Sequence, residues 1–142
     1  MYKKIFFDAN IIADLFDTSR LTHSFSSKSY LYILQNNIEL YTSCDIITTV
    51  YYIESKNDKV NALDKVYNIN QTLKIIEFSN KEVNQTCNLM KSDSDYKDLE
   101  DTMQYILAQK VGCDLIISND KNFVSKELKM MSSEEFCSEV LA

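Results

Sequence analysis

The chain has 142 residues, of which 45% are hydrophobic and 25% are charged, and its formal net charge is −6. This length and composition are typical of one globular domain, residues 1–142, and the single glycine and absent prolines leave no flexible linker. No apolar run approaches the roughly 20 residues of a membrane-spanning helix, and the N-terminal apolar run is too short for a signal peptide, so we expect a cytoplasmic protein with no membrane contact.

Strands and helices are expected to alternate in the first half of the chain. Short apolar or alternating runs predict strands, and apolar residues spaced three and four apart predict helices. The expected elements are a strand at residues 3–7, a helix at 10–16, a helix capped by Ser24 or Ser26 that ends at Asn36 and Asn37, a strand at 38–42, a helix capped by Ser43 and a helix at 58–69.

The second half of the chain continues this alternation. Gly112 is a natural left-handed helix end, and Ser132 with Glu135 has the spacing of a capping box. Such an alternation predicts an α/β fold, a three-layer α/β/α sandwich with a mostly parallel central sheet. The expected elements are a strand at residues 72–78, a helix capped by Ser79, a helix at 98–111, a strand at 113–118, a helical turn near 122–126, a strand at 128–131 and a helix from Ser132.

Three aspartates are expected to meet at one edge of this sheet. In an open parallel sheet, ligands bind beyond the carboxyl ends of the strands. Asp8 follows the first strand, Asp120 follows the strand at residues 113–118, and the connecting helix brings Asp101 to the same edge. Residues 101–111 span about 15 Å of helix, and residues 113–118 span about 17 Å of strand. The chain therefore returns to the edge from which it left.

Each acid also has a purely structural explanation. Asp8 can end a strand or cap a helix, Asp98 and Asp101 can favour a helix N-terminus, and Asp120 can belong to a turn. Only their shared edge favours a site. Carboxylates placed together repel one another, and a divalent cation removes that conflict. Oxygen ligands without a His or Cys partner suit Mg²⁺ or Mn²⁺, and the four cysteines and His23 lack the spacing of a zinc site.

Three segments resemble motifs of the PIN-domain family of metal-dependent ribonucleases. Residues 6–12, Phe-Phe-Asp-Ala-Asn-Ile-Ile, look like the opening strand and first acid of that family. Residues 98–108 are similar to its third acidic motif, in which an Asp lies seven residues before an Ala. Residues 116–123 are similar to its fourth motif, in which an Asp lies three residues before a Phe. The resemblance covers the whole chain in order and length.

This resemblance implies a fold, a reaction and partners. It implies a PIN-like fold and an endoribonuclease that cleaves RNA, often as the toxin of a toxin–antitoxin pair with an antitoxin protein as partner, and often as a homodimer. It implies Asp8, Asp101 and Asp120 as catalytic residues and metal ligands. The groups expected to support these ligands are Asn10, Thr49, Ser118 and Asn119.

The chain departs from the family at the second acidic motif. The family usually has a Glu in the helix after the second strand, where this chain has Thr48 and Thr49. Glu54 lies about 7 Å further along the helix axis on another face and is not expected to substitute. Asp98 or Asp45 can complete the acidic set, since both lie at the expected edge.

Two alternatives to a nuclease remain open. The first is a PIN-like nucleic-acid-binding or scaffold protein that has lost catalysis with the missing Glu. The second is a phosphoacceptor domain of the response-regulator type, although the chain offers no suitable mid-chain Asp. Lys97 and Lys121 lie beside the expected site, where each can contact phosphate or belong to the solvated surface. The nine tyrosines are expected to pack rather than to stack on bases.

Overall fold

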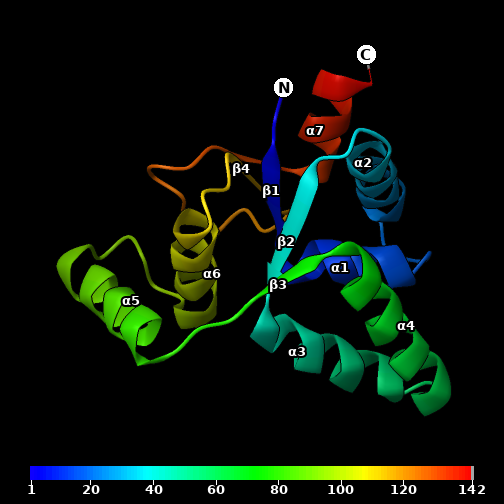
Figure 1. Ribbon diagram of the computed structural model, residues 1–142, viewed down its shortest axis with the longest axis horizontal. Helices are drawn as coiled ribbons and strands as arrows, with labels where there is room; N and C mark the ends of the chain where they lie inside the picture. The colour runs from blue at the N-terminus through cyan, green and yellow to red at the C-terminus, as the bar shows by residue number, and fades with distance from the viewer. Residues whose placement is uncertain (142) are drawn as a thin grey trace.

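The computed structural model describes residues 1–141 of the chain (Figure 1). Within these residues, five short strands alternate with seven helices. The elements are β1 (Lys4–Phe7), α1 (Ala9–Phe16), α2 (His23–Gln35), β2 (Glu39–Ser43), α3 (Cys44–Ser55), α4 (Lys59–Thr72), β3 (Lys74–Ile76), α5 (Asn80–Ser92), α6 (Leu99–Lys110), β4 (Leu115–Ile117), β5 (Met130–Met131) and α7 (Ser133–Val140).

The sheet has the strand order β3-β2-β1-β4-β5, and every neighbouring pair is parallel. β1 is central, with Phe6 opposite Tyr41 of β2 on one side and opposite Ile116 of β4 on the other. The order reverses on either side of β1, because the chain first builds outward to β3 and then returns to add β4 and β5. Such a reversal opens a crevice at the carboxyl ends of β1 and β4.

Helices cover both faces of the sheet, as the predicted three-layer sandwich requires. Figure 1 shows α5 and α6 on one side of the strands and α1, α2 and α7 on the other, with α3 and α4 packed together beyond them. The central strands are therefore covered twice and read as continuous apolar runs. The largest fully buried side chains are Phe6, Phe7, Phe136, Ile5, Ile11, Ile12, Ile33, Ile46, Leu107, Leu115, Ile116 and Ile117.

Local signals set the turn that returns the chain from α6 to β4. Gly112 has φ +76°, the left-handed conformation that glycine adopts without a steric penalty. At the start of α7, the Glu135 N–H donates to Ser132 Oγ at 3.0 Å and the Ser132 N–H donates to Glu135 Oε1 at 3.0 Å. Both the helix end and the capping box are as the sequence predicts.

The predicted cap of α2 is wrong. The helix begins at His23, after Thr22, so Ser24 and Ser26 both lie inside its first turns. Ser26 is fully buried, and its hydroxyl donates to Asp14 Oδ2 at 2.6 Å. The Ser26 hydroxyl therefore binds a residue of another helix instead of capping the N-terminus of its own helix.

Other elements also differ from the sequence prediction, and the strands expected at residues 113–118 and 128–131 shorten to Leu115–Ile117 and Met130–Met131. The strand expected at residues 72–78 is reduced to Lys74–Ile76, because Thr72 still belongs to α4 and β3 pairs only at the edge of the sheet. The helical turn expected near residues 122–126 is an irregular segment that starts with a turn, in which the Phe123 N–H donates to the Asp120 carbonyl at 3.1 Å.

Two other sequence expectations concern the cysteines and the membrane. The four cysteines are free thiols, of which Cys113 and Cys137 are buried. Among the helices in residues 1–141, none combines the length and the apolar content that a membrane crossing requires.

Candidate active site

One hydroxyl ties the carboxyl ends of β1 and β4 together. The two strands continue past their last residues, where the Asp8 N–H donates to the Ile117 carbonyl at 3.1 Å. The Ser118 hydroxyl donates to Asp8 Oδ2 at 2.7 Å and accepts from the Asp120 N–H at 3.1 Å. The two acids predicted to share an edge are thus fixed to each other through Ser118.

Asp8 is almost completely buried, with 4% of its surface exposed. Its Oδ1 accepts from the Ala9 N–H at 2.7 Å and caps α1, so the structural role predicted for it is real. Burial nevertheless raises the pKa of Asp8, and the nearby charge of Asp120 adds to this effect. The hydrogen bonds from Ser118 and Ala9 oppose the shift without cancelling it.

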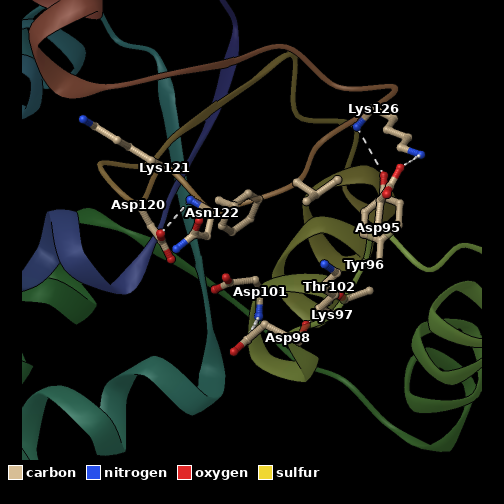
Figure 2. Close-up of a pocket in the computed structure, with 12 residues that line it drawn as sticks. Asp95, Tyr96, Lys97, Asp98, Asp101, Thr102, Asp120, Lys121, Asn122 and Lys126 are labelled. Carbon is tan, nitrogen blue, oxygen red and sulfur yellow. Dashed lines mark hydrogen bonds and ion pairs between the residues drawn. The ribbon is translucent and has the colours of Figure 1, made fainter.

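Asp101 completes the group from the first turn of α6. The turn is fixed by Asp98, whose Oδ1 accepts from the Asp101 N–H at 2.9 Å. In Figure 2 the carboxylates of Asp101 and Asp120 face each other, one from the helix and one from the loop after β4. Burial, followed by the charges of Asp8, Asp98, Asp120 and Glu100, raises the pKa of Asp101 to about 7. The edge therefore concentrates negative charge that the protein itself does not neutralise.

The donor set fits a hard divalent ion. The converging side chains of Asp8, Asp101 and Asp120 supply only oxygen ligands, which suit Mg²⁺ or Mn²⁺. Like charges that raise the pKa of a partly buried carboxyl favour a cation at the same place. Within residues 1–141, no three acidic, imidazole or thiol side chains are close enough to enclose an ion in this conformation. The acids therefore lie at one edge of the sheet, but they do not surround an ion-sized space in this conformation.

Asn10 and Asn119 support the loop that carries Asp120. The Asn119 N–H donates to Asn10 Oδ1 at 3.3 Å. The Asn119 side chain points away from the acids: its Oδ1 accepts from the Ser133 N–H at 2.9 Å and from the Ser133 hydroxyl at 3.1 Å. Asn119 thus joins the acid-bearing loop to the start of α7.

A buried aspartate anchors the other side of Asn119. Asp14 is fully buried in α1, and its Oδ2 accepts from Asn119 Nδ2 at 3.1 Å and from Thr22 Oγ1 at 2.7 Å. Its Oδ1 accepts from Arg20 Nε at 2.6 Å, and Ser26 adds a further donor. The loop behind Asp120 is therefore held by α1, α2 and α7 at once.

Thr49 does not take part in this network. Its hydroxyl donates to the Asp45 carbonyl of its own helix at 3.3 Å, and the Thr48 hydroxyl donates to the same carbonyl at 2.9 Å. Glu54 forms an ion pair with Lys65 of α4, with 2.6 Å between Oε2 and Nζ. Its carboxylate is therefore paired with a lysine outside the group of three acids. Asp45 accepts a short hydrogen bond from Ser43 at the start of α3.

Sequence reasoning missed two residues of α6 that face the acids. Burial, together with the charges of Asp45, Asp8 and Asp98, raises the pKa of Glu100, so this carboxyl shares the field of the site. Gln104 lies close enough to Asp8 to favour its ionised form. Helix spacing offered a signal for Gln104, since it lies three residues after Asp101 and hence on the same face.

A cavity of about 610 Å³ extends from the acids along the N-terminus of α6. Asp98, Asp101 and Asp120 lie along its wall, together with Lys97 and Lys121 (Figure 2). Figure 2 shows Asp120 turned toward α6, whereas Lys121 extends away from it. The lining of the cavity thus combines the carboxylates with cationic side chains.

The far wall of this cavity is held in place by two tyrosines. The Lys126 N–H donates to the Tyr96 hydroxyl at 3.2 Å, and the Glu127 N–H donates to the Tyr105 hydroxyl at 3.2 Å. The two rings pack with centroids 5.3 Å apart. These tyrosines therefore serve packing, as the sequence predicts, and they hold residues 126–127 against α6.

The comparisons with known proteins agree with this arrangement. A sequence model of the PIN domain matches residues 5–127. The chain is 47% identical over 135 residues to ribonuclease VapC1 of Aquifex aeolicus (strain VF5), an alignment that covers 95% of this chain and 94% of that protein.

Solved structures share the fold at low sequence identity. DNA-bound VapBC from Salmonella typhimurium has a TM-score of 0.70 and 12% identity, covering 92% of this chain and 98% of that one. VapBC2 from Rickettsia felis, bound to a promoter DNA fragment, has a TM-score of 0.69 and 16% identity, with coverage of 91% and 98%. Mycobacterium tuberculosis VapC20, a sarcin-ricin loop cleaving toxin, has a TM-score of 0.67 and 14% identity, with coverage of 84% and 92%. The family model and the curated relative show that this chain belongs to the PIN-domain family.

Proposed function

We propose that this protein is an endoribonuclease that hydrolyses RNA phosphodiester bonds with Mg²⁺ or Mn²⁺. The observation that carries the proposal is the convergence of Asp8, Asp101 and Asp120 at one sheet edge, where burial and repulsion raise the pKa values of Asp8 and Asp101. Such a cluster is costly unless a cation occupies it. The 47% identical relative named ribonuclease VapC1 supports the same reaction.

The three acids would bind the ion, and a neighbouring hydroxyl would orient two of them. Asp8, Asp101 and Asp120 would hold the divalent ion, with Asp98 as a further ligand at the cap of α6. When bound, such an ion activates water at neutral pH and stabilises the charge that develops on a phosphodiester. Ser118 orients the Asp8 carboxylate and the Asp120 backbone with one hydroxyl, so these two acids keep a constant relative position.

The proposal extends to partners and location. VapBC complexes among the structural relatives support a role as the toxin of a toxin–antitoxin pair, with an antitoxin protein as partner. We further propose a cytoplasmic homodimer, as is common in the family. Size-exclusion chromatography with light scattering, on the chain alone and with a neighbouring small reading frame co-expressed, would measure both associations.

A cleavage assay on labelled RNA tests the reaction directly. We expect endonucleolytic products with Mg²⁺ or Mn²⁺, no products after EDTA treatment, and recovery when the ion is restored. RNA binding without cleavage under any of these conditions would instead favour a PIN-fold binding protein, in line with the threonines that replace the second-motif Glu.

The pH dependence of stability and of metal binding should have opposite signs. The pKa of Asp101 is raised from 3.8 to about 7, so the folded protein binds more protons than the unfolded chain between these values. This stabilising contribution is complete below about pH 4 and is lost as the pH rises through about 7. Because protons compete with the ion, Mn²⁺ affinity should rise over the same interval.

Melting curves in EDTA and calorimetric Mn²⁺ titrations from pH 5 to pH 8 would measure the two trends. The Asp101→Asn variant serves as the control, because its melting temperature should lose most of this dependence. If the metal-free wild type and the Asp101→Asn variant had the same melting temperature at every pH, the assignment of this pH dependence to Asp101 would be refuted.

Lys97 and Lys121 should contribute to RNA affinity by neutralising phosphates. We expect the double variant Lys97→Ala and Lys121→Ala to bind RNA more weakly and to lower the slope of log affinity against log salt by about 1 for each phosphate that is no longer neutralised. The matched control replaces Lys28 and Lys59, exposed lysines that do not line the cavity. Equal salt slopes for the two double variants would place Lys97 and Lys121 on the solvated surface.

A further inference from the structure

The side chain of Gln104 is buried without a hydrogen-bond partner. It is 1% exposed, and both its Oε1 and its Nε2 lack a partner among residues 1–141. No other buried side-chain nitrogen or oxygen in these residues is left in this state. A buried amide that completes no hydrogen bond destabilises the fold, so its presence calls for a group that pairs with it.

The position of Gln104 identifies the side on which that group must lie. Gln104 follows Asp101 by three residues on α6, so the two side chains stack on one face of the helix. Neither the oxygen nor the nitrogen of the amide meets a carboxylate in hydrogen-bond geometry. The unpaired amide therefore lies buried on the face of α6 that also carries Asp101.

The neighbours of Gln104 on α6 have other partners. Met103 lies one residue away, and its sulfur accepts from the Thr86 hydroxyl of α5 at 3.4 Å. Tyr105, on the next residue, accepts from the Glu127 N–H and from Gln109 Nε2. The packing of α6 against α5 and against residues 126–127 therefore explains these two residues but not the amide between them.

We propose that Gln104 is a positioning residue of the acidic site, which holds a water molecule between α6 and Asp8 and thereby steadies the carboxylates for a divalent ion. In the metal-bound protein its Oε1 would accept from this water and its Nε2 would donate toward the Asp8 carboxylate, whereas in the metal-free protein neither atom has a partner among residues 1–141. A buried water needs two to four polar partners, which the amide and the surrounding carboxylates supply. Mg²⁺ retains several waters when carboxylates bind it, so such a water matches the hydration of the ion.

This proposal rests on the proposed metal site and makes a prediction that separates it from a structural role. Because the amide has no partner in residues 1–141, Gln104→Leu should leave the melting temperature of the metal-free protein unchanged or raise it. The same change should weaken Mn²⁺ binding about 10–100-fold, the range typical of groups that support metal ligands. A structural amide would give the reverse pattern.

Calorimetric Mn²⁺ titration and metal-free melting of wild type, Gln104→Leu and Gln104→Met provide the test. Gln71→Leu is the matched control, since it makes the same change at an exposed position of α4. Gln104→Met keeps the unbranched shape and replaces the leucine variant if that variant folds poorly. Weaker Mn²⁺ binding in both Gln104 variants, with melting temperatures no lower than that of the control, would support the proposal.

Three results would overturn it. Mn²⁺ binding equal to that of wild type in the Gln104 variants would refute the role of Gln104 and leave the metal site intact. Melting temperatures below that of Gln71→Leu in both variants would mean that the amide already stabilises the metal-free fold. No Mn²⁺ binding by the wild type would refute this proposal together with the proposed metal-dependent reaction.

Discussion

Replacing Asp101 with Asn is expected to abolish RNA cleavage while making the metal-free protein more stable. The side chain would keep its shape, but the proposed metal site would lose one of its negative charges. Loss of several kcal/mol of metal-assisted transition-state stabilisation corresponds to roughly 10³-fold in rate. At pH 8 the substitution also removes repulsion from Asp8, Asp98, Asp120 and Glu100, the charges that help to raise the pKa of Asp101 to about 7.

The gain in stability should be about 1–2 kcal/mol at pH 8, a value discounted from the pKa shift because the carboxyl is partly exposed to screening solvent. It should be less than half as large at pH 5, where the carboxyl is protonated in the folded protein and ionised only in the unfolded chain. Cleavage rates with Mg²⁺ and denaturant unfolding at both pH values would measure the two effects. Asp64→Asn on the exposed face of α4 is the control. Loss of activity accompanied by lower stability at pH 8 would mean that Asp101 acts through folding rather than through charge.

The location of the acids was predictable because it depends on topology rather than on side-chain detail. Alternating strands and helices dictate parallel pairing, and parallel pairing dictates that strand ends and helix starts share an edge. Asp8, Asp101 and Asp120 needed only this rule to be brought together. Gly112 and the capping box of Ser132 were equally accessible, because their partners lie within a few residues in the chain.

Ser118 contacts Asp8, as the family resemblance implies, but the other partners of several polar side chains were not predictable, because these partners are distant in sequence. Ser26 has the chemistry of a helix cap, but Asp14 takes its hydroxyl from another helix. Asn119 is predicted to support the acids, and it acts from the opposite side, through Ser133 of α7. Thr49 is predicted to lie near the site and instead bonds within α3. For each of these residues a short-range sequence pattern suggested a role, but the hydrogen bonds formed in the folded protein gave it a different one.

Replacing Asp14 with Ala is expected to destabilise the fold more than removal of any of the three site acids. Its carboxylate is fully buried and accepts hydrogen bonds from Arg20, Thr22, Ser26 and Asn119. Breaking a buried ion pair typically costs about 3–5 kcal/mol. Arg20 is partly exposed and can regain solvent, so we expect the lower end, about 3 kcal/mol. The melting temperature should then fall by roughly 10 °C.

The same variant should lose part of its activity at temperatures where it remains folded, because Asn119 is freed and the loop that carries Asp120 is less tightly held. This loss should be smaller than that of Asp101→Asn, since none of the three proposed metal ligands is removed. Asp14→Asn retains an acceptor and should have an intermediate melting temperature. Asp64→Ala, at an exposed position of α4, should behave as wild type. If Asp14→Ala were to match Asp64→Ala in denaturant unfolding, the buried network would contribute little to the folding free energy, and the loop that carries Asp120 would have to be positioned by its contacts with Asn10, Ser118 and Ser133.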